Sequence, residues 1–394
     1  MSFLSSFRDY RDLPTLWGRS FMPLAFVGRL PTSMIIIGVL TLITQVRGIG
    51  PAALMSAVLA ISIGLFQPLV GKWTDRAGQR LPLLVLAPIN AAALIALIFA
   101  QNAPMPVLTA VCALVGASTV PVGGLMRVRW YPVARTPRAL TSALSYETVA
   151  DELNFVLGPA FVGILASAVN PTLPIAITAG ISALCITSLA LHRSCPGRPE
   201  QRDENAPAIL TVAAKVAVTL AAMCCLGAFF GAMQTSTTAA ATHFGSASSA
   251  GLIYSAMGAG AALTALGSVA IPAWIDERLR ITIGGLAMVG LTLLTPLASS
   301  APQLAIILFF LGMGIGPASV AMFTLAGQLA PKGGDGVAMT AIGSANVVGV
   351  AGGAALAGKI LPHSLAGGFH LGTAAAAAMA LVGLVATLHH RRSR

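Results

Sequence analysis

Four charged side chains lie inside long apolar segments of this sequence. Arg29 belongs to the first such segment, and Glu147, Asp151 and Glu152 belong to the fifth. An ionisable group in the interior of a membrane costs about 2.5–3.5 kcal/mol on insertion scales, so it is usually paired and functional. Burial favours the neutral form of a carboxyl group and a nearby arginine favours its charged form. Carboxyl groups in this setting are therefore candidates for reversible proton binding.

The spacing of these residues predicts a charge cluster. Arg29 lies about eight residues into its segment, roughly 12 Å deep in a helix, and Glu147 lies at a similar depth. We expect Arg29 to pair with Glu147 or Asp151, and Asp151 or Glu152 to carry a transported proton. A static cluster that closes the ends of two helices, or direct substrate contact, would use the same residues. Four positions at i, i+4, i+7 and i+11 share one helix face, which are Glu147, Asp151, Asn154 and Gly158.

The composition excludes a soluble protein. Of the 394 residues, 56% are hydrophobic and only 9% are charged, whereas an ordinary soluble domain is about 25% charged. The net charge of +11 does not indicate nucleic-acid binding, because the basic residues lie in short loops between apolar blocks, where they set membrane orientation. The five cysteines and six histidines lack the spacing of metal ligands, so we expect no metal and no cofactor. No Ser/His/Asp set or phosphate-binding loop indicates an enzyme.

The apolar blocks predict an all-α membrane protein with twelve transmembrane helices. The blocks are too long for strands and show no alternation of apolar and polar residues, and only helices or closed barrels satisfy the backbone in lipid. The expected spans are 21–46, 51–70, 81–100, 104–126, 139–168, 172–192, 209–232, 247–271, 280–299, 302–327, 337–361 and 366–388.

The basic residues predict the orientation. Twenty of the 23 Lys and Arg residues fall on the side of the two termini, against Arg47 and Lys359 on the other side. Basic residues accumulate in cytoplasmic loops, so we expect both termini in the cytoplasm and the protein in the cytoplasmic (inner) membrane as a multi-pass protein. This count places Arg127 and Arg129 in a loop after the fourth helix.

A polar central segment predicts two pseudo-symmetric bundles of six helices each. Trp73 and Asp75 follow the second helix of the first half, and Trp274 and Asp276 recur at an offset of 201 in the second half. Duplicated halves are a common plan in transporters. The expected units are an N-terminal bundle (1–191), a cytoplasmic linker (192–208) and a C-terminal bundle (209–394).

The residues after the second apolar block read GKWTDRAGQR from Gly71 to Arg80. This segment resembles the signature loop of the major facilitator superfamily, from which Trp73 and Gln79 depart. The resemblance implies twelve helices and a cytoplasmic gate made by Asp75, Arg76 and Arg80. The matching residues are Gly71, Asp75, Arg76, Gly78 and Arg80.

A second element lies in the fifth block, where Gly158, Pro159 and Gly163 resemble the Gly-Pro motif of the drug/proton antiporter branch, with one residue too many before the final glycine. Pro159 removes one backbone hydrogen bond and should bend the helix. The glycines should let another helix approach closely. The resemblance implies a role in limiting proton leak, and plain helix packing is an equal alternative.

The resemblance also implies that helices 1, 4, 7 and 10 line a substrate cavity. Tyr254 and Asn346, on other helices, are weaker candidates. The expected cavity residues are Thr32, Ser33, Met34, Ser118, Thr119, Phe230, Met233, Gln234, Met313 and Phe323.

The sequence as a whole predicts a secondary active transporter. We expect proton-coupled efflux of a small hydrophobic or amphipathic molecule by alternating access, through a protein that works as a monomer. One alternative is a sugar or metabolite carrier of the same fold, which would place hydrogen-bonding side chains in the cavity and transport without a pH gradient. Another is a membrane sensor that transports nothing.

Overall fold

The structure, a computed structural model, describes residues 8–197, 207–246, 249–272 and 274–392 of the chain. Within these ranges the regular structure is entirely helical, and twelve helical segments are long and apolar enough to cross a membrane. The helices of the first half are α1 (Arg8–Trp17), α2 (Phe21–Arg47), α3 (Ile49–Ala77), α4 (Arg80–Ala100), α5 (Met105–Ser118), α6 (Val122–Trp130), α7 (Pro137–Ala168), α8 (Leu173–Ile181) and α9 (Thr187–Leu191). Those of the second half are α10 (Ile209–Lys215), α11 (Ala217–His243), α12 (Ala250–Gly267), α13 (Glu277–Thr292), α14 (Ala301–Leu329), α15 (Asp335–Ile360) and α16 (Leu365–Arg392).

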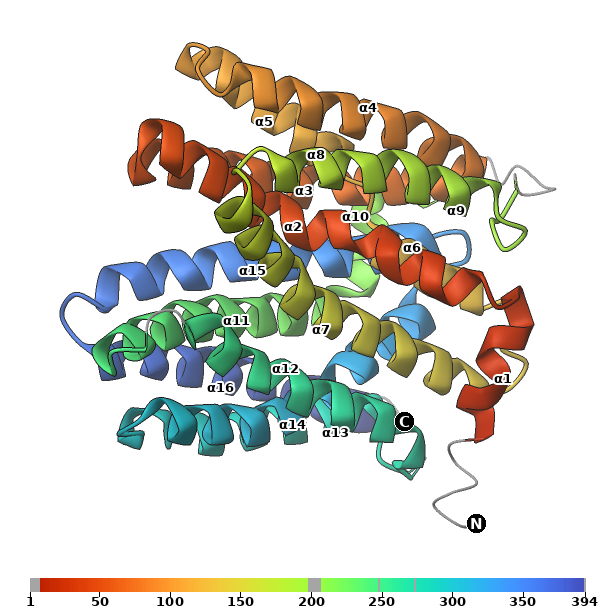
Figure 1. Cartoon of the computed structure of the whole chain (residues 1–394). Helices are drawn as coiled ribbons and strands as arrows, with labels where there is room; N and C mark the ends of the chain where they lie inside the picture. Colours follow the sequence, from red (N-terminus) through yellow and green to blue (C-terminus); the bar gives the residue numbers. More distant parts are fainter. Residues whose placement is uncertain (1–7, 198–206, 247–248, 273, 393–394) are drawn as a thin grey trace.

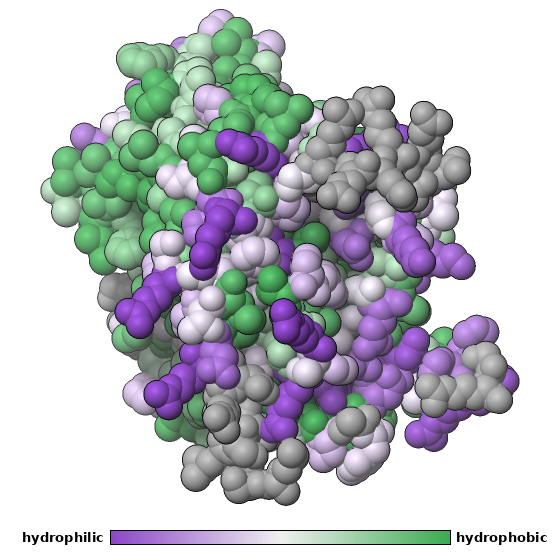
Figure 2. All heavy atoms as spheres, turned by 90° about the vertical axis from the view of Figure 1, so that its right-hand side faces the viewer, coloured by the Kyte–Doolittle hydropathy of each residue, from purple (hydrophilic) through white to green (hydrophobic). Residues whose placement is uncertain are grey.

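The helices of the two halves form two neighbouring groups, and both termini lie at the same end of the molecule (Figure 1). We call this the termini end. The second half packs around a single large cluster of buried apolar residues, whereas the buried apolar residues of the first half divide into smaller clusters. Hydrophilic residues gather on the termini end, and apolar residues cover the flank beside it (Figure 2). Large apolar side chains such as Leu65 and Leu184 point outward, as expected for a surface in contact with lipid.

Two of the membrane-spanning segments in the first half are interrupted. The fourth is broken between α5 and α6, where Pro121 lacks the N–H that would continue the helix. Asn90 of α4 holds the break by donating to the Val115 carbonyl oxygen (3.0 Å) and to Ser118 Oγ (3.1 Å). Ser182, which begins a π-helical turn (Ser182–Ile186) in the sixth segment, donates to Asn90 Oδ1 at 2.8 Å. The network ties the end of α5 to α4 and to the sixth segment.

The structure confirms the twelve expected spans and corrects several of their ends. Helix α3 continues to Ala77, so most of the signature segment is helical and the turn is confined to Gly78 and Gln79. Gly78 adopts a φ of +72°, a conformation that favours glycine. The seventh span runs from Ala217 to His243, eleven residues beyond the expected end, and its expected first residues form the separate short helix α10. Helix α1 was not expected from the sequence. Residues 198–206 of the expected linker lie outside the described residues.

Candidate functional site

The charge cluster joins α2 and α7 near the middle of the first half. Arg29 contacts both acids that the spacing indicated, because its Nη2 forms an ion pair with Glu147 Oε2 and its Nε donates to Asp151 Oδ1 at 2.9 Å. Arg29 Nη1 donates to the carbonyl oxygen of Ala25 at 2.8 Å. Glu147 is fully buried and Arg29 is 3% exposed, whereas Asp151 is 25% exposed. Asp151 is therefore the member of this trio that reaches the cavity most directly.

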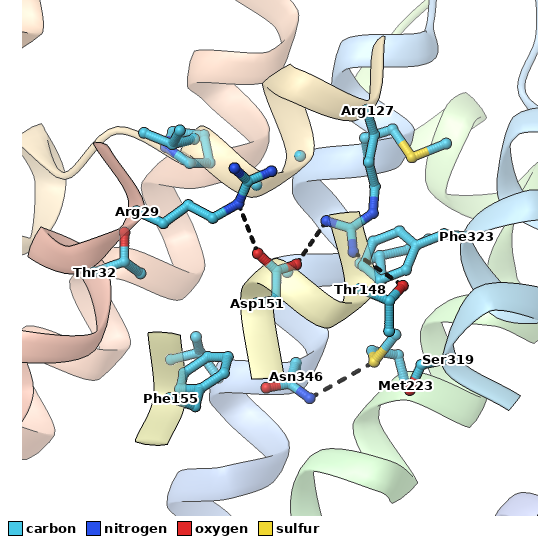
Figure 3. Close-up of a pocket in the computed structure, with 18 of the residues that line it drawn as sticks. Arg29, Thr32, Arg127, Thr148, Asp151, Phe155, Met223, Ser319, Phe323 and Asn346 are labelled. Carbon is cyan, nitrogen blue, oxygen red and sulfur yellow. Dashed lines mark hydrogen bonds and ion pairs between the residues drawn. The ribbon is translucent and has the colours of Figure 1, made fainter. Parts of the chain in front are cut away.

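A second arginine, which the sequence had placed in a loop, completes the cluster. Arg127 lies in α6, is 1% exposed, and forms an ion pair with Asp151 (Nη1 to Oδ2, 2.7 Å). Its guanidinium carbon lies 3.6 Å from the centre of the Phe323 ring on α14, a cation–π contact with the second half of the chain. Asp151 thus bridges two buried guanidinium groups (Figure 3). The basic pair of Arg127 and Arg129 is not in a loop, because α6 continues to Trp130.

Arg129 is buried away from the acids. It donates from Nε to Gln79 Oε1 (2.8 Å) and from Nη1 to Ser194 Oγ (2.8 Å) and the Leu189 carbonyl oxygen (3.1 Å). These acceptors belong to the start of α4 and to the segment around α9. Arg129 therefore fastens helices of the first half to one another at the termini end.

Trp130 anchors the buried carboxylate of Glu147. Its indole Nε1 donates to Glu147 Oε1 at 2.6 Å, and its ring packs edge-on against Phe21 with the ring centres 5.3 Å apart. Both oxygens of Glu147 therefore have a donor or a cation beside them, which is what a fully buried charge requires.

Glu152 and Asn154 behave differently from the paired acids, although both line the cavity. Within the part of the chain that the structure describes, no basic group forms an ion pair with Glu152. The Asn154 amide donates to the Ala150 carbonyl oxygen in its own helix at 2.8 Å, and its Oδ1 is buried without a partner. Of the predicted cluster, Arg29, Glu147 and Asp151 thus form one ion-paired group. The Glu152 carboxylate and the Asn154 Oδ1 lie beside this group and are not part of it.

A cavity of about 140 Å³ lies between the two halves and is walled on one side by the charge cluster (Figure 3). Typical small-molecule sites enclose about 300–1,000 Å³, so the cavity is contracted in this conformation. Polar and apolar side chains face it together. Hydrogen-bonding groups come from Thr32, Ser33, Gln67, Thr148, Asn154, Ser319, Thr340 and Asn346, and the larger apolar ones are Phe155, Met223, Leu226, Phe230, Phe323, Met339 and Ile342.

Four of the ten expected cavity residues line this cavity, and Asn346 does so as well. The four are Thr32, Ser33, Phe230 and Phe323. The other six are placed elsewhere. Met34 packs against Thr178 of α8, and Ser118 and Thr119 contact Asn90 at the break of the fourth span. In the second half, Met233 lies in the apolar core next to Gly372, and Met313 packs near Gly260. Gln234 is exposed.

The residues of the signature segment lie at the termini end, where α3 meets α15. Asp75 accepts hydrogen bonds from the backbone N–H groups of Gly336 (to Oδ1, 2.7 Å) and Val337 (to Oδ2, 3.0 Å). These are the first donors of α15, which have no partner within the helix, and the positive end of the helix dipole favours a carboxylate there. Arg76 and Arg80 are exposed at the same end. One carboxylate thus joins the two halves.

Glycines make this approach tight. A Cβ on Gly336 would lie 2.5 Å from Asp75 Oδ1 and 2.8 Å from the Gly71 carbonyl oxygen, and a Cβ on Gly71 would lie 2.8 Å from the backbone carbon of Gly336. Any larger side chain at either position would push α3 and α15 apart. The two glycines are therefore required for the closed arrangement.

The Gly-Pro element of α7 has one glycine in a tight contact and one in open space. A Cβ on Gly158 would lie 2.7 Å from the Ser33 Cβ of α2, whereas nothing lies within 4 Å of the corresponding position on Gly163. Gly158 therefore permits close packing of α2 and α7, and Gly163 does not serve helix packing. Pro159 lies inside α7.

Contacts between the halves lie at mid-membrane or nearer the termini end. Along α3 and α15 they run from Gly64, beside Val348, to Asp75 at the start of α15. On the other side of the cavity, Gly258 of α12 lies beside Val156 of α7. Toward the opposite end the helices of the two halves diverge (Figure 1). The structure therefore represents a state closed at the termini end.

Comparison with known proteins agrees with this architecture. The sequence profile of the Major Facilitator Superfamily matches residues 21–354. The chain therefore belongs to this superfamily, and it is a multi-pass membrane protein and a secondary transporter. The crystal structure of the human organic anion transporter MFSD10 (TETRAN) is similar in fold, with a TM-score of 0.68 at 15% identity, over 92% of this chain and 98% of that one. No curated protein sequence matches the chain.

Proposed function

We propose that this protein exports a small amphipathic molecule in exchange for protons, by alternating access across the cytoplasmic membrane, with both termini in the cytoplasm. The observation that carries the proposal is the pair of adjacent carboxylates at the cavity wall. Asp151 bridges two buried arginines, whereas Glu152 has no ion pair among the described residues.

The charges of the cluster leave room for one proton. Three carboxylates, those of Glu147, Asp151 and Glu152, face two guanidinium groups, those of Arg29 and Arg127. With all five ionised the cluster carries one net negative charge, and burying an uncompensated charge is costly. One bound proton removes this excess.

Glu152 is the carboxylate that we assign to this proton. A proton on Asp151 would leave the buried Arg127 without its ion-pair partner, which typically costs about 3–5 kcal/mol, and a proton on Glu147 would remove one of the two carboxylates paired with Arg29. A proton on Glu152 breaks no ion pair. Because Glu152 lines the cavity, the same proton can leave when a substrate enters or when the cavity opens to the other side.

The cavity walls favour an amphipathic substrate. Phe155, Phe230 and Phe323 supply apolar surface, and Asn346 and Thr32 supply hydrogen-bonding groups to the same cavity. Because the present cavity holds about 140 Å³, a substrate of ordinary size requires the cavity to widen as the two halves rearrange.

A second candidate function is a carrier for a small polar metabolite. Eight hydrogen-bonding side chains line the cavity, which is the feature that a sugar or metabolite carrier needs. The two candidates differ in their dependence on protons, because a uniporter for a polar solute needs no carboxylate to change its protonation state.

The test uses the purified full-length protein in lipid vesicles with an imposed pH gradient. Uptake would be followed for ethidium, for a neutral amphiphilic dye and for radiolabelled glucose, and proton movement would be followed with a pH-sensitive dye in the lumen. We expect the dye that is transported to move only with a pH gradient and to move protons in the opposite direction.

Glu152→Gln should abolish this gradient-driven transport while retaining exchange of the dye at equal pH. Asp12→Asn, which removes an exposed carboxylate of α1, is the matched control and should behave as the wild type. Wild-type pH dependence in an Asp151→Asn, Glu152→Gln double variant would refute the proton role of both residues. Transport of glucose without a pH gradient would favour the second candidate.

A further inference from the structure

The two seams between the halves at the termini end are closed in different ways. At the first seam, between α3 and α15, the Asp75 carboxylate binds the start of α15. The internal repeat of the sequence would place Asp276 in the same role at the second seam, between α7 and α12. Instead, Asp276 pairs with Arg278 in its own half at 3.2 Å.

The helix that Asp276 would have capped already has its own cap. Thr136 Oγ1 accepts the backbone N–H of Ala139 at the start of α7 at 3.1 Å, and Pro137 at the first helical position needs no acceptor. Within the described part of the chain, no carboxylate binds a helix start across the second seam. The contact that the repeat would predict is therefore replaced by something else.

The amphipathic helix α1 lies at this second seam. Its Tyr10 hydroxyl donates to the Leu266 carbonyl oxygen at 2.8 Å, in the last turn of α12, where carbonyl groups lack partners within the helix. This bond joins residues 256 positions apart and crosses from the first half to the second. Burial raises the pKa of Tyr10 to about 12, so the hydroxyl remains a donor throughout the physiological range.

The rest of α1 is anchored to the first half. Leu13 is 2% exposed and belongs to the same apolar cluster as Phe21 and Trp130. Trp17 Nε1 donates to the Arg129 carbonyl oxygen at 3.1 Å, and Arg193 Nε donates to the Trp17 carbonyl oxygen at 2.9 Å. Helix α1 also packs against α2 and α7. The helix is thus fixed at one end and reaches the second half through Tyr10.

We propose that α1 is a strap that holds the second seam closed through the hydrogen bond from Tyr10 to the last turn of α12. The superfamily profile begins at residue 21, so the strap lies outside the segment that defines the family. Opening of the termini end must break the Tyr10 bond, because the donor and the acceptor belong to different halves. The strap therefore biases the protein toward the state that is closed at the termini end.

The test measures the ratio of open to closed molecules directly, without substrate or pH gradient, so it does not depend on the proposed proton coupling. Spin labels would be attached to Arg135→Cys and Trp274→Cys, both at exposed positions, in full-length protein whose five native cysteines are replaced. Distances would be measured by pulsed electron spin resonance in lipid nanodiscs. The background is Asp75→Asn, which weakens the first seam and so populates the open state.

In this background, Tyr10→Phe should raise the ratio of open to closed molecules about two- to tenfold, the range expected for one hydrogen bond. Tyr146→Phe is the matched control, because it also removes a tyrosine hydroxyl bonded to a backbone carbonyl, that of Met22 at 3.3 Å, but within one half. Ser145→Ala is the second control, since it removes another neighbour of the Tyr10 hydroxyl and leaves the bond to α12. Both should change the ratio less than twofold.

An open-to-closed ratio that is unchanged or reduced by Tyr10→Phe would overturn the strap. So would an equal increase in Tyr146→Phe or Ser145→Ala, since the effect would then not arise from the bond across the seam.

Discussion

Replacing Asp75 by alanine should open the termini end. The substitution removes the acceptor for the two backbone N–H groups of Gly336 and Val337, at 2.7 and 3.0 Å. Loss of an N-capping side chain costs about 0.5–2 kcal/mol, and loss of a negative charge at a helix start costs about 0.3–1 kcal/mol, more when it is partly buried. The closed state should therefore lose about 2–3 kcal/mol relative to the open state, in which α3 and α15 are apart.

This loss corresponds to a shift of about 30- to 150-fold in the ratio of open to closed molecules, since about 1.4 kcal/mol is a factor of ten. Asp75→Asn loses the charge and one of the two acceptor oxygens but keeps the other, so its shift should be smaller, about tenfold. The spin-label pair described above measures both ratios in nanodiscs. Arg76→Ala, at the exposed neighbouring position, is the control and should leave the ratio unchanged.

The reasoning fails if Asp75→Ala gives the same ratio as Arg76→Ala. It also fails if Asp75→Asn opens the protein more than Asp75→Ala does, because the effect would then not follow from the acceptor and the charge.

Three further predictions concern single contacts. Trp130→Phe should lower the free energy of unfolding by about 1–3 kcal/mol, because it removes the donor to the buried Glu147 carboxylate; thermal unfolding in detergent measures this, and Trp274→Phe, at a position 77% exposed, should have no effect. Gly336→Ala should raise the open fraction like Asp75→Ala, since its Cβ would lie within 2.8 Å of three atoms of α3; a fully closed spin-label distance would contradict the tight contact. Burial and two neighbouring arginines hold the pKa of His192 below its usual value, so the unfolded chain binds more protons and stability should fall as pH is lowered from 7.5 through about 6.5 to 5.5. His192→Asn should show a smaller loss of thermal stability over this range, and an unchanged loss would count against the assignment.

The fold could be predicted from the sequence because long apolar blocks are easily recognised from their composition. Twelve apolar blocks and their polar connections leave no other architecture, and the structure confirms all twelve. That Arg29 would pair with Glu147 or Asp151 could be predicted because charges inside apolar segments must find partners, and the structure pairs Arg29 with both. The gate segment at Asp75 could be placed at the end of a helix, although its helical conformation up to Ala77 was not visible in the pattern.

The sequence did not distinguish Arg127, the second arginine of the cluster, from the basic residues of the loops. Arg127 follows the apolar block by one residue and is close to Arg129, Arg135 and Arg138, so a count of basic residues per loop includes it. Its burial depends on α6 continuing to Trp130. The two preceding glycines, Gly123 and Gly124, were a sequence signal for close helix packing at this point. A Cβ added to Gly124 would lie 3.0 Å from the Met339 carbonyl oxygen of α15, so this glycine lets α6 approach the second half closely.

The cavity residues were the least predictable part. One step along a helix turns a side chain by about 100°, so Ser33 faces the cavity while the next residue, Met34, faces α8. Membrane helices that are apolar on all sides give no sequence pattern that distinguishes a cavity face from a packing face. Only the packing of neighbouring helices settles which side each residue takes.

In the proposed function, the charge cluster and the two seams act on the same motion. Alternating access requires two states that differ by only a few kcal/mol, so the closed end has to be held by contacts of small and separable strength. The Asp75 cap and the Tyr10 bond are contacts of this kind, each joining one atom group of the first half to a helix end of the second. Arg127 supplies a third link, since its guanidinium binds Asp151 on one side and the Phe323 ring of the second half on the other. A change of charge beside Asp151 therefore alters the field at a group that also holds the halves together, and in the proposed function this couples the cluster to the opening of the termini end.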